Sequence, residues 1–273
     1  MKGIDMHYNF IKCAKRFITG IDEEELDWQL RTHQCYFDDS GPCCSDSTLL
    51  KVFREATFNK VDENVLYGVI EKICMCYCDE IKSAQSLTSI IIPEGTPAIE
   101  PYAFRGFTAL TSITIPESVT EIGFDAFYEC TSLTSIAIPK NLTKIESSVF
   151  RGCTGLTSIV IPESVTEIEV GAFRDCTGLT TIVIPKGVTK ISPYVFRGCT
   201  GLTSIVIPES VTEIKGGAFN DCTGLTSITI PSSVTEIEYS AFFGCTGLKE
   251  ITVSSENLLE EVKLPEGVKV IIA

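Results

Sequence analysis

The feature that most constrains this chain is a 23-residue repeat, which begins near residue 86 and continues through most of the remaining sequence. Three residue types recur at that interval. The leucines are Leu87, Leu110, Leu133, Leu156, Leu179, Leu202, Leu225 and Leu248; the prolines are Pro93, Pro116, Pro139, Pro162, Pro185, Pro208 and Pro231; the phenylalanines are Phe104, Phe127, Phe150, Phe173, Phe196, Phe219 and Phe242. Because repeats of about 20–50 residues are typical of solenoids, these columns predict a chain whose repeats pack against their neighbours.

One repeat, residues 153–175, reads CTGLTSIVIPESVTEIEVGAFRD. Its β-branched residues favour a strand over 156–161, and Pro162 ends that strand because proline has no backbone N–H to donate. Residues 172–176 predict a helical or 3₁₀ turn, and Thr177-Gly178 predicts a reversal of the chain. Stacked repeats would align their strands in a parallel sheet on one face, about 4.7–4.9 Å apart.

Two finer patterns run through the repeats. Residues 151–168 and 197–214 are identical, so part of the array has a larger period of 46 residues. Charge alternates in two columns, of which the first is Glu117, Lys140, Glu163, Lys186 and Glu209, and the second is Glu121, Lys144, Glu167, Lys190 and Glu213. We expect stacked neighbours to pair opposite charges and so favour correct register. A charge-patterned binding surface is the alternative.

The pattern LxxIxIPxxVTxIxxxAFxxCxxL resembles the BspA-type leucine-rich-repeat family over about residues 86–253. The resemblance implies a curved solenoid with short turns on its convex side. It also implies a role in adhesion or protein–protein contact, since members known as surface adhesins bind host matrix proteins or other microbes.

The first part of the chain has no 23-residue period, and its apolar residues instead follow a helical spacing, as between Tyr8 and Ile18. We therefore predict an α+β protein with three parts. A small all-helical N-terminal cap domain covers residues 1–84. The leucine-rich-repeat solenoid follows over 85–253, with seven full repeats and an eighth strand and with its parallel sheet on one face. A C-terminal cap covers 254–273.

The strand residues that alternate with the apolar ones are expected to face solvent and to form the binding surface. They are Thr157, Ser158, Val160, Thr180, Thr181, Val183, Thr203, Ser204, Val206, Thr226, Ser227 and Thr229. This face is a ladder of hydroxyls beside a small apolar stripe. A uniform ladder could match a repeating ligand such as a glycan, a fibrous protein or an ice lattice; a solvated sheet face built from good strand formers is the alternative.

Variation between repeats concentrates just before the phenylalanine column. Tyr102, Phe124, Tyr194 and Tyr239 lie there as candidate binding residues on the edge or convex side, because aromatic side chains are enriched at binding hot spots. Free drift at unconstrained loop positions explains the same variation.

Six of the 13 cysteines recur every 23 residues: Cys130, Cys153, Cys176, Cys199, Cys222 and Cys245. Small buried thiols suit a tight turn, so we predict packing residues, with disulfides or a thiolate metal chain as alternatives. The other cysteines and His33 precede the repeats. Zinc would need four converging ligands, and the spacing Cys74-x-Cys76-x-Cys78 fits poorly on a helix. Free thiols are expected there, with zinc or disulfides as alternatives.

The formal net charge of −14 argues against nucleic acid and anionic membrane surfaces as partners. No run of about 18 apolar residues predicts a membrane span. The polar opening MKGIDMHYNF is unlike a secretory leader, which favours a cytoplasmic location, or a surface or secreted one if a leader was removed.

We find no phosphate loop, dinucleotide fingerprint or metalloprotease helix, and both histidines, His7 and His33, precede the repeats. The sequence therefore predicts no enzyme and no cofactor or metal. The expected function is a protein–protein interaction module that binds its partner through the solenoid. The alternatives are a surface adhesin or binder of a repeating glycan, matrix or ice lattice, and a structural scaffold whose helical domain recognises the partner.

Overall fold

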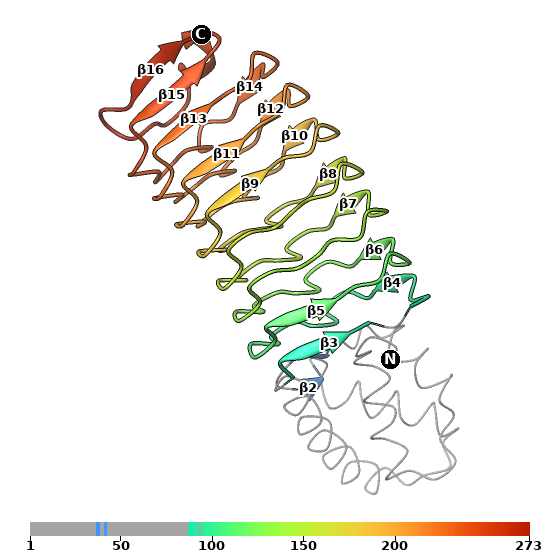
Figure 1. The fold of residues 1–273 in the computed structure, drawn as a ribbon. Helices are drawn as coiled ribbons and strands as arrows, with labels where there is room; N and C mark the ends of the chain where they lie inside the picture. The colour runs from blue at the N-terminus through green and yellow to red at the C-terminus, as the bar shows by residue number, and fades with distance from the viewer. Residues whose placement is uncertain (1–36, 39–40, 43–86, 93) are drawn as a thin grey trace, which may run out of the picture. The chain divides into compact units, whose positions relative to one another are not determined.

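The structure is a computed structural model that describes residues 37–38, 41–42, 87–92 and 94–273 (Figure 1). Leu87–Ala273 belong to one compact unit and Ile4–Ser86 to another. In the latter, the structure describes one antiparallel pair, β1 (Phe37–Asp38) with β2 (Gly41–Pro42). The predicted helical domain over 1–84, with His33 and the N-terminal cysteines, otherwise lies outside the described residues.

The repeats form a parallel β-solenoid of about eight turns, which confirms the predicted sheet of strands stacked at intervals of 23 residues (Figure 1). The strands of this first row are β3 (Ser89–Ile91), β5 (Ser112–Thr114), β9 (Thr181–Val183), β11 (Ser204–Val206), β13 (Ser227–Thr229) and β15 (Glu250–Val253). They pair two by two, β3 with β5, β9 with β11, and β13 with β15. Between the first two pairs, a single parallel bridge joins Ala137 to Val160.

A second row of shorter strands follows each proline turn. It consists of β4 (Ala98–Ile99), β6 (Glu121–Ile122), β7 (Lys144–Ile145), β8 (Glu167–Ile168), β10 (Lys190–Ile191), β12 (Glu213–Ile214) and β14 (Glu236–Ile237). Its pairs are also parallel and in register, as Lys144 with Glu167 and Glu213 with Glu236. Pro162 accepts a hydrogen bond from the Val165 amide at 3.0 Å, so the proline begins the turn between the two rows.

The helical or 3₁₀ turn predicted on the opposite side of each repeat takes the 3₁₀ form in the described residues. Amides there alternate between two acceptors: Arg174 N–H bonds to Gly171 within its own turn at 3.0 Å, whereas Phe173 N–H bonds to Val195 of the next repeat, also at 3.0 Å. Positive φ angles at Gly171 (63°) and Asp175 (59°) interrupt the right-handed path. A helix would need an unbroken run of that path, so the chain forms single turns of the 3₁₀ hydrogen-bond type.

The core consists of columns of identical or similar residues, one from each repeat. The seven phenylalanines of the repeat are its largest fully buried side chains, at under 2% exposure. Successive rings stack with centroids 5.3–5.8 Å apart and planes within 14° of parallel. Six leucines, from Leu110 to Leu225, are completely buried, whereas the first, Leu87, is 43% exposed. Neighbouring repeats thus bury each other's apolar groups, as predicted.

The C-terminal segment continues the sheet. After β15 comes a short 3₁₀ helix, η1 (Glu256–Leu259), for which Ser255 is the N-cap. The chain then returns as β16 (Lys269–Ile272), which pairs in parallel with β15. Val270 and Ile272 are 36% and 50% exposed. This segment therefore adds one more strand beside β15.

Candidate functional site

The first strand row presents its alternate residues to solvent, and we call this surface the sheet face. All twelve residues predicted for it are exposed, from Thr157, Ser158 and Val160 to Thr226, Ser227 and Thr229. Between them Ile159, Ile182 and Ile205 point into the core. The twelve residues are thus exposed as the sequence predicts, and their role in binding stays a prediction.

Three threonine hydroxyls of the sheet face are engaged with the backbone of the neighbouring repeat. Thr157 Oγ1 donates to Thr134 O, Thr180 Oγ1 to Thr157 O and Thr203 Oγ1 to Thr180 O, at 3.2–3.4 Å. These three hydroxyl protons are thereby used, so at these positions a ligand meets oxygen lone pairs and methyl groups.

A stripe of three valines runs along the middle of the sheet face. Val160, Val183 and Val206, here called the valine stripe, are 82%, 59% and 59% exposed. Threonines hold the same place in β5 and β13, and Ala137 holds it beside Val160. Because Ala137 is small, a shallow depression of about 560 Å³ opens there, the central depression. Its lining residues are Glu117, Ala137, Ile138, Lys140, Val160, Pro162, Glu163 and Ser164.

The first charged column borders the valine stripe, since three of its members line the central depression. We call Glu117, Lys140, Glu163, Lys186 and Glu209 the charge row. Its expected lysine–glutamate ion pairs are replaced by another contact: Glu117 Oε2 accepts from the Lys140 backbone N–H at 2.8 Å, and Glu163 Oε2 accepts from that of Lys186 at 3.4 Å. Each glutamate carboxylate thus satisfies the backbone amide of the lysine in the next repeat. The side chains of Lys140 and Lys186 are exposed.

The second charged column does form ion pairs, together with residues two positions further on. Lys144 Nζ lies 3.1 Å from Glu146, 3.9 Å from Glu167 and 3.3 Å from Glu169. Alternation ends at Glu213, which pairs in register with Glu236.

Lys215 compensates for the like charges of Glu213 and Glu236, because its Nζ lies 2.9 Å from the first and 3.1 Å from the second. A hydrogen bond from Lys215 lowers the pKa of Glu213, and the bonds to both glutamates raise the pKa of Lys215. These clusters stabilise one strand register and lie on the second row, away from the sheet face.

The four aromatic residues proposed as anchors lie on the turns. Tyr102 and Phe124 are brought together, with ring centroids 4.8 Å apart in an edge contact. Phe124 and Tyr194 are 42% exposed, and Tyr239 is 62% exposed. Tyr102 and Tyr194 have positive φ angles of 60° and 58°, which non-glycine residues rarely adopt. These side chains are accessible, but they belong to different repeats and form no single surface.

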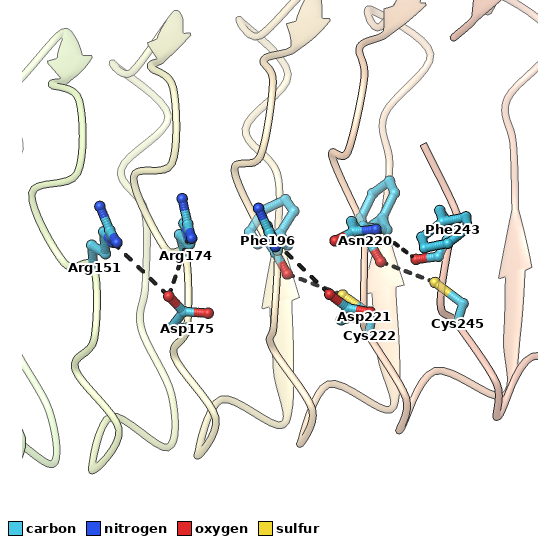
Figure 2. A network of polar contacts seen from close by, with 11 residues as sticks. Arg151, Arg174, Asp175, Phe196, Asn220, Asp221, Cys222, Phe243 and Cys245 are labelled. Atoms are coloured by element: carbon cyan, nitrogen blue, oxygen red, sulfur yellow. Dashed lines mark hydrogen bonds and ion pairs between the residues drawn. The ribbon is translucent and has the colours of Figure 1, made fainter. Parts of the chain in front are cut away.

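A network of arginines and aspartates on the turns was missed by sequence reasoning (Figure 2). Asp175 lies 3.9 Å from Arg151 Nε and 3.3 Å from Arg174 Nε, and Asp221 lies 3.9 Å from Arg197 Nε. The three arginines are 23 residues apart, so the signal was present in the sequence. Each of the three arginines lies close to an aspartate, and the pairs Arg151–Asp175 and Arg197–Asp221 join neighbouring repeats.

The cysteine column is buried beneath these turns, as predicted for packing residues, and its six members are free thiols. Each Sγ donates to the carbonyl of the phenylalanine 26 residues earlier, as Cys222 to Phe196 at 3.0 Å (Figure 2). Burial raises the pKa of Cys130, Cys199 and Cys245 to about 12. Such thiols stay protonated at neutral pH, and a protonated buried thiol is a poor nucleophile and metal ligand.

The geometry of the repeat agrees with a known family. The model for the BspA type leucine rich repeat region matches six copies, over residues 79–202 and 189–259. The chain belongs to this family. A comparison with curated proteins gives no significant match.

Solved structures of leucine-rich-repeat proteins resemble the chain. A leucine-rich repeat protein from Eubacterium ventriosum is 31% identical, with a TM-score of 0.53, over 67% of this chain and 46% of that one. A leucine rich cell surface protein from Faecalibacterium prausnitzii is 29% identical, with a TM-score of 0.47, over 68% and 65%. The T. pallidum leucine rich repeat protein is 29% identical, with a TM-score of 0.48, over 68% and 73%. The chain thus spans less than two thirds of the first two relatives.

Within the residues that the structure describes, no helix is long and apolar enough to cross a membrane. The exposed residues of the BspA-type repeats form two kinds of accessible surface. One is the regular sheet face with its apolar centre, and the other consists of scattered aromatic residues on the turns.

Proposed function

We propose that the chain is a protein-binding module and that the sheet face is its binding surface. The observation that carries this proposal is the valine stripe, three neighbouring exposed valines on a rigid sheet, with the central depression at one end and the charge row along one side. An apolar centre beside polar and charged groups is the arrangement found in protein–protein interfaces. Exposed apolar patches on otherwise soluble surfaces commonly mark such sites.

The position of the stripe favours a protein over a repeating ligand. A glycan, matrix fibre or ice lattice that contacts every repeat alike would be matched by the same outward residue in every repeat. The third outward position instead changes along the solenoid, from Thr114 through Ala137 and Val160 to Thr229. A surface with a distinct centre suits a partner that binds in one place.

We also propose a non-enzymatic role, because the outward groups of the sheet face suit contact with a partner. Its outward groups are threonine and serine hydroxyls, some of them bonded to the backbone, together with aliphatic side chains and paired or solvated charges. Residues 87–273 contain no histidine, and the cysteines of the repeats are held as buried thiols. The expected cytoplasmic location stays a prediction, which cell fractionation would test.

The test is capture of partners by the full chain and by Val183→Lys, compared by quantitative mass spectrometry. A lysine there places a charge at the centre of the stripe without disturbing the core, because Val183 is largely exposed. Thr189→Lys, at an exposed position beside the second strand row, is the matched control. Partners lost with Val183→Lys and kept with Thr189→Lys support the sheet face. Equal capture by both variants contradicts it, and would direct attention to the scaffold alternative, in which the first 84 residues recognise the partner.

A further inference from the structure

We infer that the partner that the sheet face fits is a second copy of this chain, packed antiparallel so that the Val160 repeat of each copy lies against the Val183 repeat of the other. The inference rests on the proposed function, because it names the partner of the same surface. It follows from the order of charges along the solenoid, which matches itself under one two-fold axis, and under the same axis the valine stripe meets itself.

The axis lies in the plane of the interface, parallel to the strands, between the Val160 and Val183 repeats. Rotation about it reverses the order of the repeats and keeps the strand direction. Each valine stripe then faces the other stripe, and each charge row faces the other charge row. Such an interface is isologous, so every favourable contact occurs twice.

The charge row is complementary to itself in this register. Glu163 faces Lys186 of the second copy, and Lys140 faces Glu209 of the second copy. Each pair occurs twice, and all four side chains are exposed. An axis through the Glu163 repeat would instead set Lys140 against Lys186. An axis one repeat earlier, between Lys140 and Glu163, would set the exposed Glu94 against Glu209, so alternation of charge selects the proposed register.

The apolar side chains match in the same register. Val160 faces Val183 of the second copy, and Ala137 faces Val206, so the central depression beside Ala137 receives a valine side chain. Outside the apolar centre, Thr114 faces Thr229 of the second copy. Moving the axis one repeat earlier would set Thr114 against Val183 and leave Ala137 opposite Val160. That earlier axis would also set Ile91, which is 75% exposed, against Val206, whereas the proposed axis sets it against Thr252. The order of charges therefore decides between the two axes.

The surface is large enough for a stable dimer. Seven strand spacings separate the β3 and β15 positions, about 33 Å, and six residues separate Thr157 from Glu163, about 20 Å. A footprint of roughly 33 by 20 Å approaches the standard interface of about 800 Å² per partner, because side-chain relief adds accessible area to the footprint.

The experiment measures self-association of the full chain by sedimentation equilibrium and compares it with Lys186→Glu, Glu163→Lys and an equal mixture of the two. In Lys186→Glu homodimers Glu163 faces a glutamate, and in Glu163→Lys homodimers Lys186 faces a lysine. We expect each variant alone to associate at least about tenfold more weakly, because like charges face each other twice. In the mixture every such position again holds opposite charges, so the heterodimer should recover the affinity of the unmodified chain. Lys190→Glu, the same change on the second row, should leave self-association unchanged.

Recovery in the mixture identifies this register, since a misfolded variant cannot be rescued by its complement. A full chain that stays monomeric to about 100 µM, or a dimer whose association the mixture does not restore, overturns the inference. Either result leaves the proposed function open to its own test, because capture of other proteins by the unmodified chain and by Val183→Lys is measured separately.

Discussion

Replacing one phenylalanine of the stacked column tests the idea that neighbouring repeats stabilise each other. Phe173 is completely buried, and its ring stacks on those of Phe150 and Phe196 with centroids 5.5 and 5.8 Å apart. Phe173→Ala removes the buried ring and leaves a cavity between two repeats. Such changes cost about 3–5 kcal/mol, and loss of two stacked neighbours places this one at the upper end of that range.

The end of the column supplies an internal comparison. Phe242 is equally buried and stacks on Phe219 with centroids 5.4 Å apart, but it is the last member of the column. Since one aromatic pair contributes about 0.5–1.5 kcal/mol beyond its buried area, we expect Phe242→Ala to cost less than Phe173→Ala by about that amount. Tyr194→Ala removes an aromatic ring that is 42% exposed and should cost less than either.

The assay is urea unfolding of the full chain followed by far-ultraviolet circular dichroism. The three variants are compared through their midpoints and through the slope m, which must stay constant for the free energies to be comparable. Equal losses for Phe173→Ala and Phe242→Ala would show that stacking along the column adds nothing to burial. A loss below about 1 kcal/mol for Phe173→Ala would refute the central role of the column altogether.

Two further predictions concern the turns. An added Cβ at Gly155 would lie 2.5 Å from Thr131 O of the preceding repeat, so Gly155→Ala should destabilise the chain by about 1–3 kcal/mol in urea, while Ser158→Ala at an exposed position should change it little. Burial raises the pKa of Cys199 to about 12, against about 8.5 for an unfolded thiol. Stability is therefore fully present below about pH 8.5 and falls as pH rises towards 12, because only the unfolded state then loses protons. A lower urea midpoint at pH 10 than at pH 8, with iodoacetamide labelling of Cys199 confined to unfolded chains, would confirm this; native labelling at pH 9 would contradict it.

The repeat columns made most of the solenoid predictable. Leu156, Phe173 and Cys176 recur because each fills the same place in a stack, and a buried place tolerates few residue types. Pro162 marked the end of the strand through its missing N–H, a property that does not depend on the surroundings. Alternation along 156–161 likewise separated the residues of the sheet face from those of the core.

The turns were not predictable in the same way, because their conformation depends on contact with the next repeat. Asp175 adopts a positive φ of 59° while its amide donates to Arg197 of the following repeat at 2.7 Å. An aspartate beside an arginine has no local feature that demands this conformation. Similarly, alternating charges predicted ion pairs in the charge row, but the distance from Glu163 to a backbone amide could be known only once the repeats were stacked.

The 46-residue period connects the turns with the sheet face. At the second positive-φ position of each turn, glycine alternates with an acidic residue: Gly152, Asp175, Gly198, Asp221 and Gly244 follow one another. A Cβ at Gly198 or Gly244 would meet the carboxylate of the aspartate in the preceding repeat, so glycine leaves room there for the acidic side chain. The charge row alternates in sign with the same period. The turn residues and the charge row therefore both repeat every two repeats, a length of about 9.5 Å at two strand spacings. A partner that binds the charge row can shift along the solenoid only by two repeats at a time, since a shift by one repeat sets like charges against each other.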